Sequence, residues 1–456
     1  MKVALIGGGG ARTPLLLHGL AQAQAQLQLR ELVLFDVNRE SAELMAAIGC
    51  EIARANSAKF AIHVASKVED AIEGSRFVLS SIRVGGMEAR ARDERVVIEQ
   101  GLAGQETTGP GGLAMALRTL PVALEHARIM ERLAPKAWLI NFTNPAGLIT
   151  QALNTHTNVK VIGICDTPSE LFHRTAWALG LPYERMEFCY SGLNHLGWVY
   201  RVNLDGQDIT CRLMDNTAAL AKIYTAPLFD PHMIQIMGLL PSEYLFFYYS
   251  KSGAFTNQKT AGASRGEEIA KMNATLYAKL RTEVDASNAP RAIEIYKQYL
   301  NQRNASYLQL ESRAGSAFDE GPHDWNPFEG ATGYHRIALD VMTALCSEKP
   351  KQVVVNVRNH GVIDDIQPSD VVEVPCLINR DGPEPQKAGP MPETVRGLTL
   401  AVKAYEHLAI RAAMERSLDL AKLALMVNPI VGEWESAGRV WQALVDSDPE
   451  HLGYLK

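Results

Sequence analysis

The chain has 456 residues, of which 47% are hydrophobic and 21% charged, a composition that excludes extensive disorder. Its 45 lysines and arginines against 51 aspartates and glutamates give a net charge of −6, which argues against a nucleic-acid-binding surface. No apolar stretch approaches the ~20 residues of a membrane helix and six scattered cysteines lack CxxC spacing, so we expect a reduced, cytoplasmic protein without a membrane span.

The first third of the chain alternates short apolar runs with helical patterns. We predict helical stretches such as 14–30 and 113–133 between strands at 2–6, 31–36, 60–64, 77–82, 138–142 and 161–164. Apolar runs separated in this way are typical of a parallel sheet covered by helices. The pattern predicts an α/β fold with a doubly wound, Rossmann-type parallel sheet, in a first domain of residues 1–195.

The pattern changes after about residue 186. Two runs, 188–193 and 198–204, predict antiparallel strands that are joined by a turn at 194–197. Further on we expect helices at 265–284 and 333–346, a surface excursion at 312–332, strands at 352–357 and 371–378, and one long or broken helix at 394–427. Because no polar linker separates the two halves, we predict a mixed α+β C-terminal domain, residues 196–456, that packs on the first.

A glycine run follows the first predicted strand and precedes a helix. Such a turn needs glycine because the backbone must bend sharply and let a pyrophosphate approach the helix N-terminus. The spacing departs from GxGxxG at position 12, which is arginine. An acid at the end of the second strand favours NAD over NADP, since it would accept hydrogen bonds from the ribose and repel a 2′-phosphate. The candidate cofactor residues are Gly7, Gly8, Gly9, Arg12, Thr13 and Asp36.

Cys165 ends an apolar strand in the sequence Gly-Ile-Cys-Asp-Thr-Pro, and His195 lies in the predicted turn at 194–197. Taken alone, a cysteine that closes a buried strand is usually a small core residue. A single histidine in a turn is usually structural. Their separation of 195 − 165 = 30 residues is not a zinc-finger spacing, so the pair by itself does not indicate a metal site.

Several short motifs occur in order along nearly the whole chain. They are GGGGARTP at residue 7, RVGG at 83, GQETTG at 104, NFTNP at 141, CDTP at 165, NH at 194, SRGE at 264 and NVRNHG at 356. Together they resemble glycoside hydrolase family 4, the NAD- and divalent-metal-dependent glycosidases, and within it the 6-phospho-β-glucosidases. The resemblance implies a nucleotide domain like that of lactate and malate dehydrogenases, and a homodimer or homotetramer.

The reaction that the resemblance implies differs from that of the two-carboxylate glycosidases. In the family, NAD⁺ takes a hydride from sugar C3, which makes the C2 proton acidic. A base removes that proton, the aglycone leaves C1, water adds, and the hydride returns to C3. The enzyme would therefore hydrolyse an O-glycosidic bond without net oxidation.

The resemblance also assigns metal ligands and a base. Cys165 and His195 match the family's ligands for a divalent cation, usually Mn²⁺, although a thiolate and an imidazole would also hold Co²⁺, Ni²⁺ or Fe²⁺. Tyr244 aligns with the tyrosine that removes the C2 proton, and Tyr248, four residues on, is the rival. A free phenol has a pKa of about 10, so a nearby cation must lower the pKa of this tyrosine.

Asn144 and Asp166 match residues that hold the sugar hydroxyls, and Asp166 is also a candidate catalytic residue. The β-specific enzymes usually carry asparagine after the metal cysteine, whereas aspartate is typical of the phospho-α-glucosidases. Asp166 therefore leaves both anomers open.

Arg83, Arg90 and Arg265 are the candidates for binding a substrate anion, because guanidinium groups suit phosphate. Arg90 and Arg265 could instead pair with Asp93 and Glu268, in which case the substrate would be a plain glucoside or a uronate. Glu106 either orients a metal-bound water or caps the following turn.

Two other functions are compatible with the nucleotide domain. A hydroxy-acid dehydrogenase would use His195 as an acid–base group, would need no metal and would accumulate NADH. A non-catalytic NAD sensor would have no reason to keep Cys165, His195 and a tyrosine together. The substrate of the glycosidase or of the dehydrogenase would be a small molecule. We expect neither nucleic acid nor a membrane as a partner.

Overall fold

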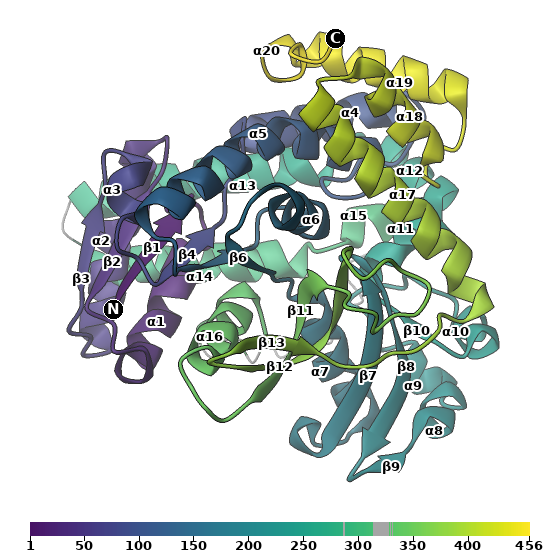
Figure 1. The fold of residues 1–456 in the computed structure, drawn as a ribbon, viewed down its shortest axis with the longest axis horizontal. Helices are drawn as coiled ribbons and strands as arrows, with labels where there is room; N and C mark the ends of the chain where they lie inside the picture. The colour runs from purple at the N-terminus through teal and green to yellow at the C-terminus, as the bar shows by residue number, and fades with distance from the viewer. Residues whose placement is uncertain (286–287, 313–327, 329, 331) are drawn as a thin grey trace.

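The computed structural model describes residues 1–285, 288–312, 328, 330 and 332–456, so most of the expected excursion at 312–332 lies outside the described residues. In the described residues the strands form one 13-stranded mixed sheet in the order β10-β8-β7-β12-β11-β6-β5-β4-β1-β2-β3, with β13 beside β12 and β9 beside β8. The sheet runs through the molecule and is covered by helices (Figure 1). This arrangement confirms the predicted α/β class.

The N-terminal half holds the six parallel strands of the sheet. They are β1 (Lys2–Ile6), β2 (Glu31–Phe35), β3 (Ala61–Val64), β4 (Phe77–Ser80), β5 (Trp138–Asn141) and β6 (Lys160–Gly163). The helices between and after them are α1 (Thr13–Leu27), α2 (Arg39–Ala55), α3 (Val68–Ile72), α4 (Gly86–Glu99), α5 (Gly109–Leu133), α6 (Ala146–His156) and α7 (Thr167–Leu179). The order β3-β2-β1-β4-β5-β6 is that of a doubly wound dinucleotide-binding sheet.

Antiparallel strands of the second half extend the same sheet. They are β7 (Met186–Leu193), β8 (Leu196–Leu204), β9 (Gln207–Asp208), β10 (Leu240–Pro241), β11 (Lys351–Arg358), β12 (Val371–Asn379) and β13 (Gly382–Pro385). β7 and β8 form the predicted hairpin, with Gly192 opposite Gly197. β11 joins β6 through the pairing of Asn356 with Gly163, so the sheet is continuous across the two halves.

The second half supplies most of the remaining helices. Short ones are η1 (Tyr183–Arg185), α8 (Thr210–Met214), α9 (Thr217–Leu220), α10 (Pro231–Met237), η2 (Glu243–Leu245), α11 (Phe246–Tyr249), α15 (Gln309–Ser312) and α20 (Pro449–Leu452). Longer ones are α12 (Lys251–Ala261), α13 (Arg265–Asp285), α14 (Ala289–Ala305), α16 (Tyr334–Ala344), α17 (Glu393–Glu415), α18 (Leu418–Val427) and α19 (Trp434–Ser447). The expected helix at 394–427 is broken at Arg416, which has a φ of 55°, and Ser417 caps α18.

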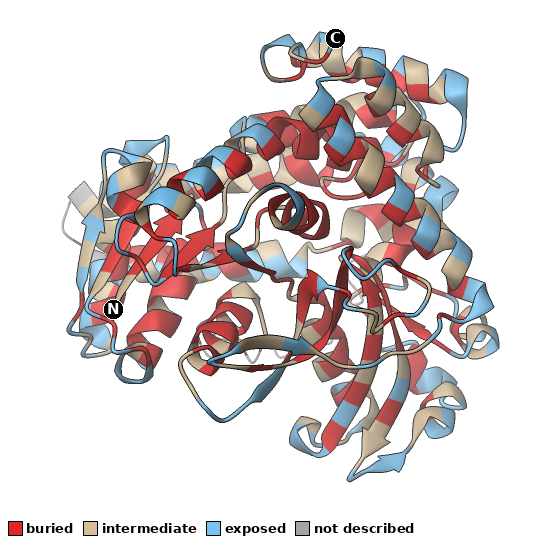
Figure 2. Cartoon of the chain, viewed as in Figure 1, coloured by how far each residue is buried: buried red, intermediate tan, exposed pale blue. Residues whose placement is uncertain are grey.

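Buried residues concentrate on the central strands and on the helix faces that cover them (Figure 2). One hydrophobic cluster contains buried residues of both halves, so the two halves share a core. A second cluster packs Met45 and Ile48 of α2 against Leu280 of α13 and Tyr296 of α14. Helices from the second half therefore lie against the nucleotide-binding half.

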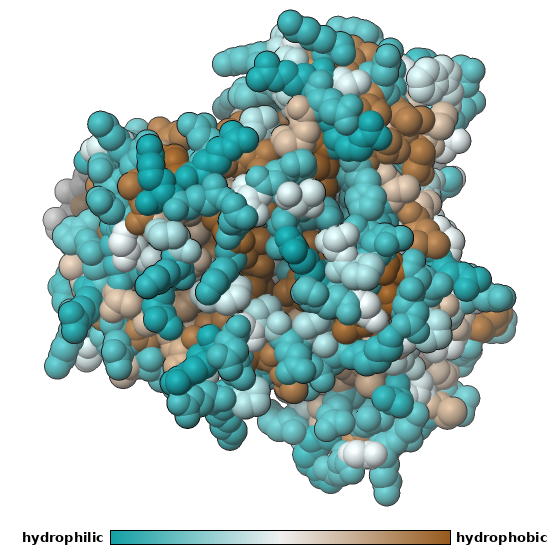
Figure 3. Space-filling view, in the orientation of Figure 1, coloured by the Kyte–Doolittle hydropathy of each residue, from teal (hydrophilic) through white to brown (hydrophobic). Residues whose placement is uncertain are grey.

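The visible face is mostly hydrophilic, with hydrophobic residues gathered over α17 and α18 (Figure 3). Large apolar side chains that remain partly exposed include Leu400 on α17 and Trp434 on α19. Among the described residues, no helix is both long and apolar enough to cross a membrane.

Candidate active site

The predicted site residues of the first half follow the carboxyl ends of neighbouring parallel strands. The glycine run follows β1, Asp36 follows β2, Arg83 follows β4, Asn144 follows β5, and Cys165 with Asp166 follows β6. In a doubly wound sheet the carboxyl ends of the strands lie along one edge, where ligands bind beside the reversal of strand order. The fold thus brings together residues that are up to 160 positions apart in the sequence.

The glycine run forms a tight turn in which side chains have no room. Gly7 has a φ of 87°, and a Cβ on it would lie 2.3 Å from the Ser81 carbonyl oxygen. The Gly9 N–H donates to Oδ2 of Asp36 at 2.9 Å. At the start of α1, the side chain of the N-cap residue Arg12 accepts no hydrogen bond from the backbone N–H groups of the first turn. A turn of this shape that leads into an uncapped helix fits the pyrophosphate of a dinucleotide.

The side chain of Arg12 contacts Asp166 and Tyr334. Its Nη1 lies 3.4 Å from Oδ2 of Asp166, and its guanidinium lies 4.6 Å from the centre of the Tyr334 ring. The structure therefore joins a predicted cofactor residue to a predicted substrate residue. Burial raises the pKa of Asp166, while the charge of Arg12 opposes that rise. Thr13, by contrast, is buried as the first residue of α1.

His195 occupies the β7–β8 turn with a φ of 60° and is only 1% exposed. Neither of its ring nitrogens has a hydrogen-bond partner among the described residues, although both are buried. Burial lowers the pKa of His195 to about 4, so the imidazole is neutral at pH 7 and free to act as a ligand. A buried imidazole without partners is costly unless something else binds its nitrogens.

Cys165 is 3% exposed at the end of β6. Burial, with the negative charges of Glu373 and Asp166 added to it, raises the pKa of the Cys165 thiol well above its usual range. A thiolate there needs a positive partner, and a divalent cation would be one. Among the described residues no group of three or more His, Cys, Asp and Glu side chains is arranged to hold a metal ion. Two protein ligands would leave coordination positions for a substrate, as catalytic metal sites require.

Tyr244, on η2, packs face to face with His195 at a centroid distance of 3.8 Å and an angle of 8°. Its hydroxyl lies 3.1 Å from the hydroxyl of Tyr307, which donates at 2.6 Å to Oε1 of Glu243. Burial raises the pKa of Tyr244 well above 10 and that of Glu243 to about 8. The chain of hydroxyl, hydroxyl and carboxyl could therefore pass a proton at neutral pH.

Tyr248 lines a small cavity together with Thr107, Pro145, Asn194 and Glu406, so it lies beside the histidine turn without stacking on His195. Its pKa is raised by burial and, to a smaller extent, by the charge of Glu406. Of the two candidate tyrosines, Tyr244 is thus the one in contact with His195.

Glu373 on β12 supports the histidine turn. Its carboxylate accepts hydrogen bonds from the Tyr190 hydroxyl at 2.8 Å, from Asn194 at 3.1 Å and from Asn356 at 2.9 Å. These bonds tie β7, β11 and β12 together beside Cys165. Sequence reasoning missed Glu373, although an acid within the apolar run 371–378 was a usable signal.

Arg83 and Arg90 both bind Glu106. Arg83 Nη2 lies 2.5 Å from Oε2 of Glu106, and Arg90 Nη1 lies 3.1 Å from Oε1. Burial alone would disfavour the carboxylate, but the two arginines lower the pKa of Glu106 to about 2. Arg90 also pairs with Glu94 at 2.8 Å, not with Asp93 as sequence reasoning allowed. Nη1 of Arg83 is buried and has no hydrogen-bond partner within the described ranges of the chain.

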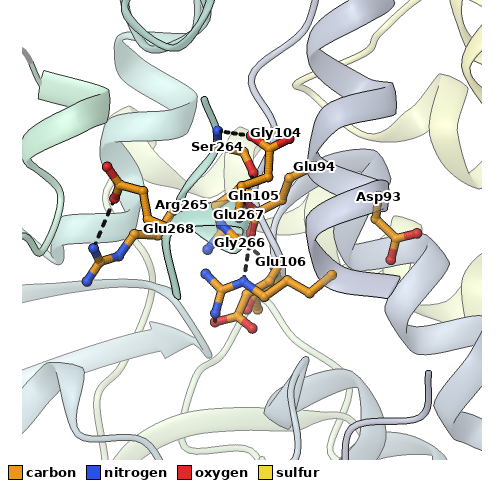
Figure 4. A network of polar contacts seen from close by, with 12 residues as sticks. Asp93, Glu94, Gly104, Gln105, Glu106, Ser264, Arg265, Gly266, Glu267 and Glu268 are labelled. Atoms are coloured by element: carbon orange, nitrogen blue, oxygen red, sulfur yellow. Dashed lines mark hydrogen bonds and ion pairs between the residues drawn. The ribbon is translucent and has the colours of Figure 1, made fainter. Parts of the chain in front are cut away.

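Arg265 is committed to structural contacts. It pairs with Glu268 at 3.2 Å, as the sequence allowed, and donates to Ser306 Oγ at 2.6 Å and to the Arg303 carbonyl at 2.8 Å. Figure 4 shows its side chain turned toward Glu268, apart from Glu106. Arg303 and Tyr307 were missed by sequence reasoning because neither lies in a recognisable motif.

Comparison with known proteins agrees with this geometry. A model described as Family 4 glycosyl hydrolase matches residues 2–180, and the Family 4 glycosyl hydrolase C-terminal domain matches residues 190–431. A protein named probable 6-phospho-beta-glucosidase from Bacillus subtilis (strain 168) is 30% identical over 100% of this chain and 97% of its own length. The 6-phospho-beta-glucosidase BglT of Thermotoga maritima is 27% identical over 99% of both chains.

Solved structures give the same picture. The 6-phospho-beta glucosidase from Thermotoga maritima with manganese, NAD⁺ and glucose-6-phosphate superposes with a TM-score of 0.80 at 26% identity, covering 99% of both chains. Lactate dehydrogenase from Eimeria maxima has a TM-score of 0.51 at 13% identity, covering 91% of this chain and 95% of its own. This similarity confirms the predicted Rossmann-type fold. The chain belongs to family 4 of the glycosyl hydrolases.

Proposed function

We propose that this glycoside hydrolase cleaves the O-glycosidic bond of 6-phosphoglucosides, and that it does so with NAD and a divalent cation. The names of the relatives support the substrate, and the cofactors of the Thermotoga maritima structure support the chemistry. The observation that carries the proposal is the buried His195, whose two nitrogens have no hydrogen-bond partner in the part of the chain that the structure describes and whose ring packs on Tyr244. A net oxidation by a dehydrogenase would need neither a metal nor this tyrosine.

The turn at Gly7–Gly9 and the start of α1 at Thr13 would hold the pyrophosphate, with Asp36 accepting hydrogen bonds from the ribose. NAD, when bound, would supply hydride removal at sugar C3 and its return after bond cleavage. Asp36 already shapes the turn, since its two carboxylate oxygens accept from the N–H groups of Gly9 and Asn38 at 2.9 Å each.

Cys165 and His195 would hold the cation, which is most consistent with Mn²⁺ because the related structure contains manganese. A divalent cation at this position would stabilise negative charge on the sugar oxygens and lower the pKa of a nearby phenol. The donor set fits such an ion, since one ligand is a neutral imidazole and the other a buried thiol beside the negative charges of Glu373 and Asp166.

Tyr244 would remove the proton from C2 of the sugar. Its hydroxyl is oriented by the Tyr307 hydroxyl, and Glu243 can take the proton onward because its pKa of about 8 is near neutrality. Asn144 and Asp166 would contact the sugar hydroxyls. Burial keeps the pKa of Asp166 raised, so this residue could also donate a proton to the departing aglycone oxygen.

The proposal also includes the anomeric configuration of the glycosidic bond that is cleaved. The relatives include both 6-phospho-beta-glucosidases and maltose-6′-phosphate glucosidases, at 24–30% identity. We favour the β-anomer because the relatives at 27% and 30% identity reported above carry that name. Asp166 remains the feature that favours an α-glycoside.

A panel of p-nitrophenyl α- and β-glucosides, each with and without a 6-phosphate, tests the proposal. We expect the 6-phospho-β-glucoside to be cleaved fastest, only with NAD⁺ and Mn²⁺ present, and without a steady rise in absorbance at 340 nm. Turnover that accumulates NADH would contradict the proposal, and turnover of plain glucosides at the same kcat/KM would contradict its phosphate requirement.

We also propose a homodimer or homotetramer in the cytoplasm. The partly exposed Leu400 and Trp434 on α17 and α19 support an interface between copies of the chain. We also propose a domain boundary at residue 195, with one sheet that both domains share, since β6 and β11 pair across that boundary. Light scattering during size-exclusion chromatography gives the oligomeric state, and a monomer would contradict the interface.

A further inference from the structure

Two tyrosines of the second half bind the glycine turn that follows β1. The Tyr277 hydroxyl donates to the Gly9 carbonyl at 2.5 Å, and the Tyr296 hydroxyl donates to the Ala11 carbonyl at 2.7 Å. Tyr277 lies on α13 and Tyr296 on α14, so these bonds join residues that are 268 and 285 positions apart. The turn is therefore held from outside the nucleotide-binding half.

Helices α13 and α14 reach the turn because they pack on the nucleotide-binding half beside α2 (Figure 1). Ala11 of the turn belongs to the same hydrophobic cluster, in which Tyr296 is fully buried with an exposed fraction of 0%. Tyr277 is half-buried and packs against this cluster. Close packing of both rings fixes the positions of the two hydroxyls.

The hydrogen bond from Tyr277 holds the turn closed. A peptide bond is planar and trans, so its C=O and its N–H point in opposite directions. The N–H opposite the Gly9 carbonyl is that of Gly10, and it donates to the Gly7 carbonyl at 3.2 Å. The Gly9 N–H donates to Oδ2 of Asp36 at 2.9 Å. Both backbone groups of Gly9 are thus held, one by Asp36 and the other by Tyr277.

The hydrogen bond from Tyr296 orients the start of α1. The N–H opposite the Ala11 carbonyl is that of Arg12, the N-cap residue of α1. N–H groups at a helix start have no acceptor within the helix and are suited to phosphate oxygens. A rotation of this peptide would put a carbonyl oxygen in place of the N–H, and that oxygen would repel a phosphate. Tyr296 opposes the rotation, because the rotation would leave its hydroxyl and the carbonyl buried and unpaired.

Helix α14 also leads to the candidate base. Tyr307 follows the end of α14, and its hydroxyl lies 3.1 Å from the hydroxyl of Tyr244. One helix therefore contacts the turn that would bind NAD and leads to the tyrosine that would remove the C2 proton. The hydride leaves C3 and the proton leaves C2 of the same sugar, so the cofactor and the base must keep a fixed separation.

Tyr299 on α14 provides a comparison within the same helix pair. Its hydroxyl donates to Oδ1 of Asn273 at 2.6 Å and accepts from Nη1 of Arg303 at 2.8 Å. Both contacts lie within α13 and α14, and Tyr299 is buried in the same cluster as Tyr296. The two tyrosines differ in that only the Tyr296 hydroxyl binds the turn.

We propose that Tyr277 and Tyr296 are positioning residues for the cofactor, which hold the glycine turn in the conformation that binds the pyrophosphate of NAD. Each acts through a carbonyl of the turn. The affinity for NAD then depends on how α13 and α14 pack on the nucleotide-binding half. The inference rests on the proposed function and deepens it, since it gives the second half of the chain a part in binding NAD.

Calorimetric titration with NAD⁺ of Tyr277→Phe, Tyr296→Phe and the double variant tests the proposal. Phenylalanine keeps the ring in the cluster and removes only the hydroxyl. Without its hydrogen bond the turn populates conformations that do not bind, so the apparent affinity falls by the fraction that remains competent. We expect each single variant to raise the Kd of NAD⁺ about 3- to 10-fold, and the double variant to raise it about 10- to 100-fold.

The matched control is Tyr299→Phe, which should lower the Tm as Tyr296→Phe does and leave the Kd of NAD⁺ unchanged. Amide hydrogen exchange without NAD⁺ gives a second readout, because residues 7–13 should exchange faster in the double variant than in the wild type. Tyr277 is half-buried, so Tyr277→Phe alone carries the test if the double variant does not fold.

Unchanged NAD⁺ affinity in the double variant would overturn the proposal. An equal loss of affinity in Tyr299→Phe would also overturn it, since NAD⁺ binding would then follow the stability of the helix pair and not the two bonds to the turn. A wild-type protein that does not bind NAD⁺ would contradict the proposed function and this inference together. Wild type and double variant that bind NAD⁺ equally well would contradict this inference alone.

Discussion

Replacing Glu106 by glutamine removes one charge from the centre of the arginine cluster and keeps the shape of the side chain. Arg83 lies 2.5 Å and Arg90 3.1 Å from its two oxygens, and the pair lowers the pKa of Glu106 from 4.5 to about 2. A shift of about 2.5 units corresponds to about 3 kcal/mol in favour of the ionised form. The glutamine resembles the protonated form, so we expect Glu106→Gln to lose about 3 kcal/mol of stability at pH 7, similar to the cost of breaking a buried ion pair.

The contribution of Glu106 to the free energy of unfolding should decrease as the pH falls. Because the folded pKa is below the unfolded one, Glu106 contributes its full stability above pH 4.5 and loses it as the pH falls toward 2. The difference in free energy of unfolding between wild type and Glu106→Gln should shrink to about 2 kcal/mol at pH 3.5. In a chain of this length 3 kcal/mol corresponds to about 3 °C in Tm.

Thermal and urea unfolding at pH 7 and pH 3.5 measure these differences. Glu99→Gln, at the exposed end of α4, is the matched control and should shift Tm by less than about 1 °C. Equal stability of wild type and Glu106→Gln at pH 7 would refute the reasoning. A difference that stays constant down to pH 3.5 would show that its cause is packing and not charge.

Three further predictions concern the cation, the nucleotide and acid sensitivity. Cys165→Ser should abolish the rise in Tm that Mn²⁺ causes in the wild type, because a hydroxyl is a far weaker donor than a thiolate; full turnover after chelator treatment would contradict the metal site. Asp36→Ala should weaken NAD⁺ binding about 10- to 100-fold in calorimetry, since it removes the ribose acceptor and the bond to Gly9, and unchanged affinity would exclude the ribose role. Burial lowers the pKa of His335 to about 3, so the folded protein resists its protonation and loses stability as the pH falls below 6.5. Wild type should therefore lose about 2–3 kcal/mol more than His335→Gln between pH 7 and pH 4.5, as followed by urea unfolding.

The fold was largely predictable because central strands such as β1 and β4 are buried and read as apolar runs. The predicted strand at 2–6 matches β1 residue for residue, and the hairpin at 188–204 was expected from its turn. The short helices α8–α11 were not predicted, since four to seven residues carry too little periodicity to be recognised. The break at Arg416 depends on a single left-handed residue that is not glycine, so no sequence signal marks it.

The candidate site was predictable where a motif carries it. The motifs led to Cys165, His195 and Tyr244, and the structure adds that Tyr244 packs on His195. Pairings between distant side chains were not predictable, because they depend on how segments far apart in the chain pack together. The Arg12–Asp166 pair and the Tyr307 hydroxyl are examples, each formed by residues more than 60 positions apart.

The most direct test of the central claim follows the proton at C2 of the sugar. Turnover of the preferred 6-phosphoglucoside in D₂O should place deuterium at C2 of the released sugar, as seen by NMR, because a base removes that proton before the aglycone leaves. Tyr244→Phe keeps the ring on His195 and removes only the hydroxyl, so it should slow turnover by about two to four decades while NAD⁺ and Mn²⁺ still bind. A product that carries no deuterium at C2, formed at a normal rate by the wild-type enzyme, would contradict the account, since direct displacement by a pair of carboxylates leaves that proton in place.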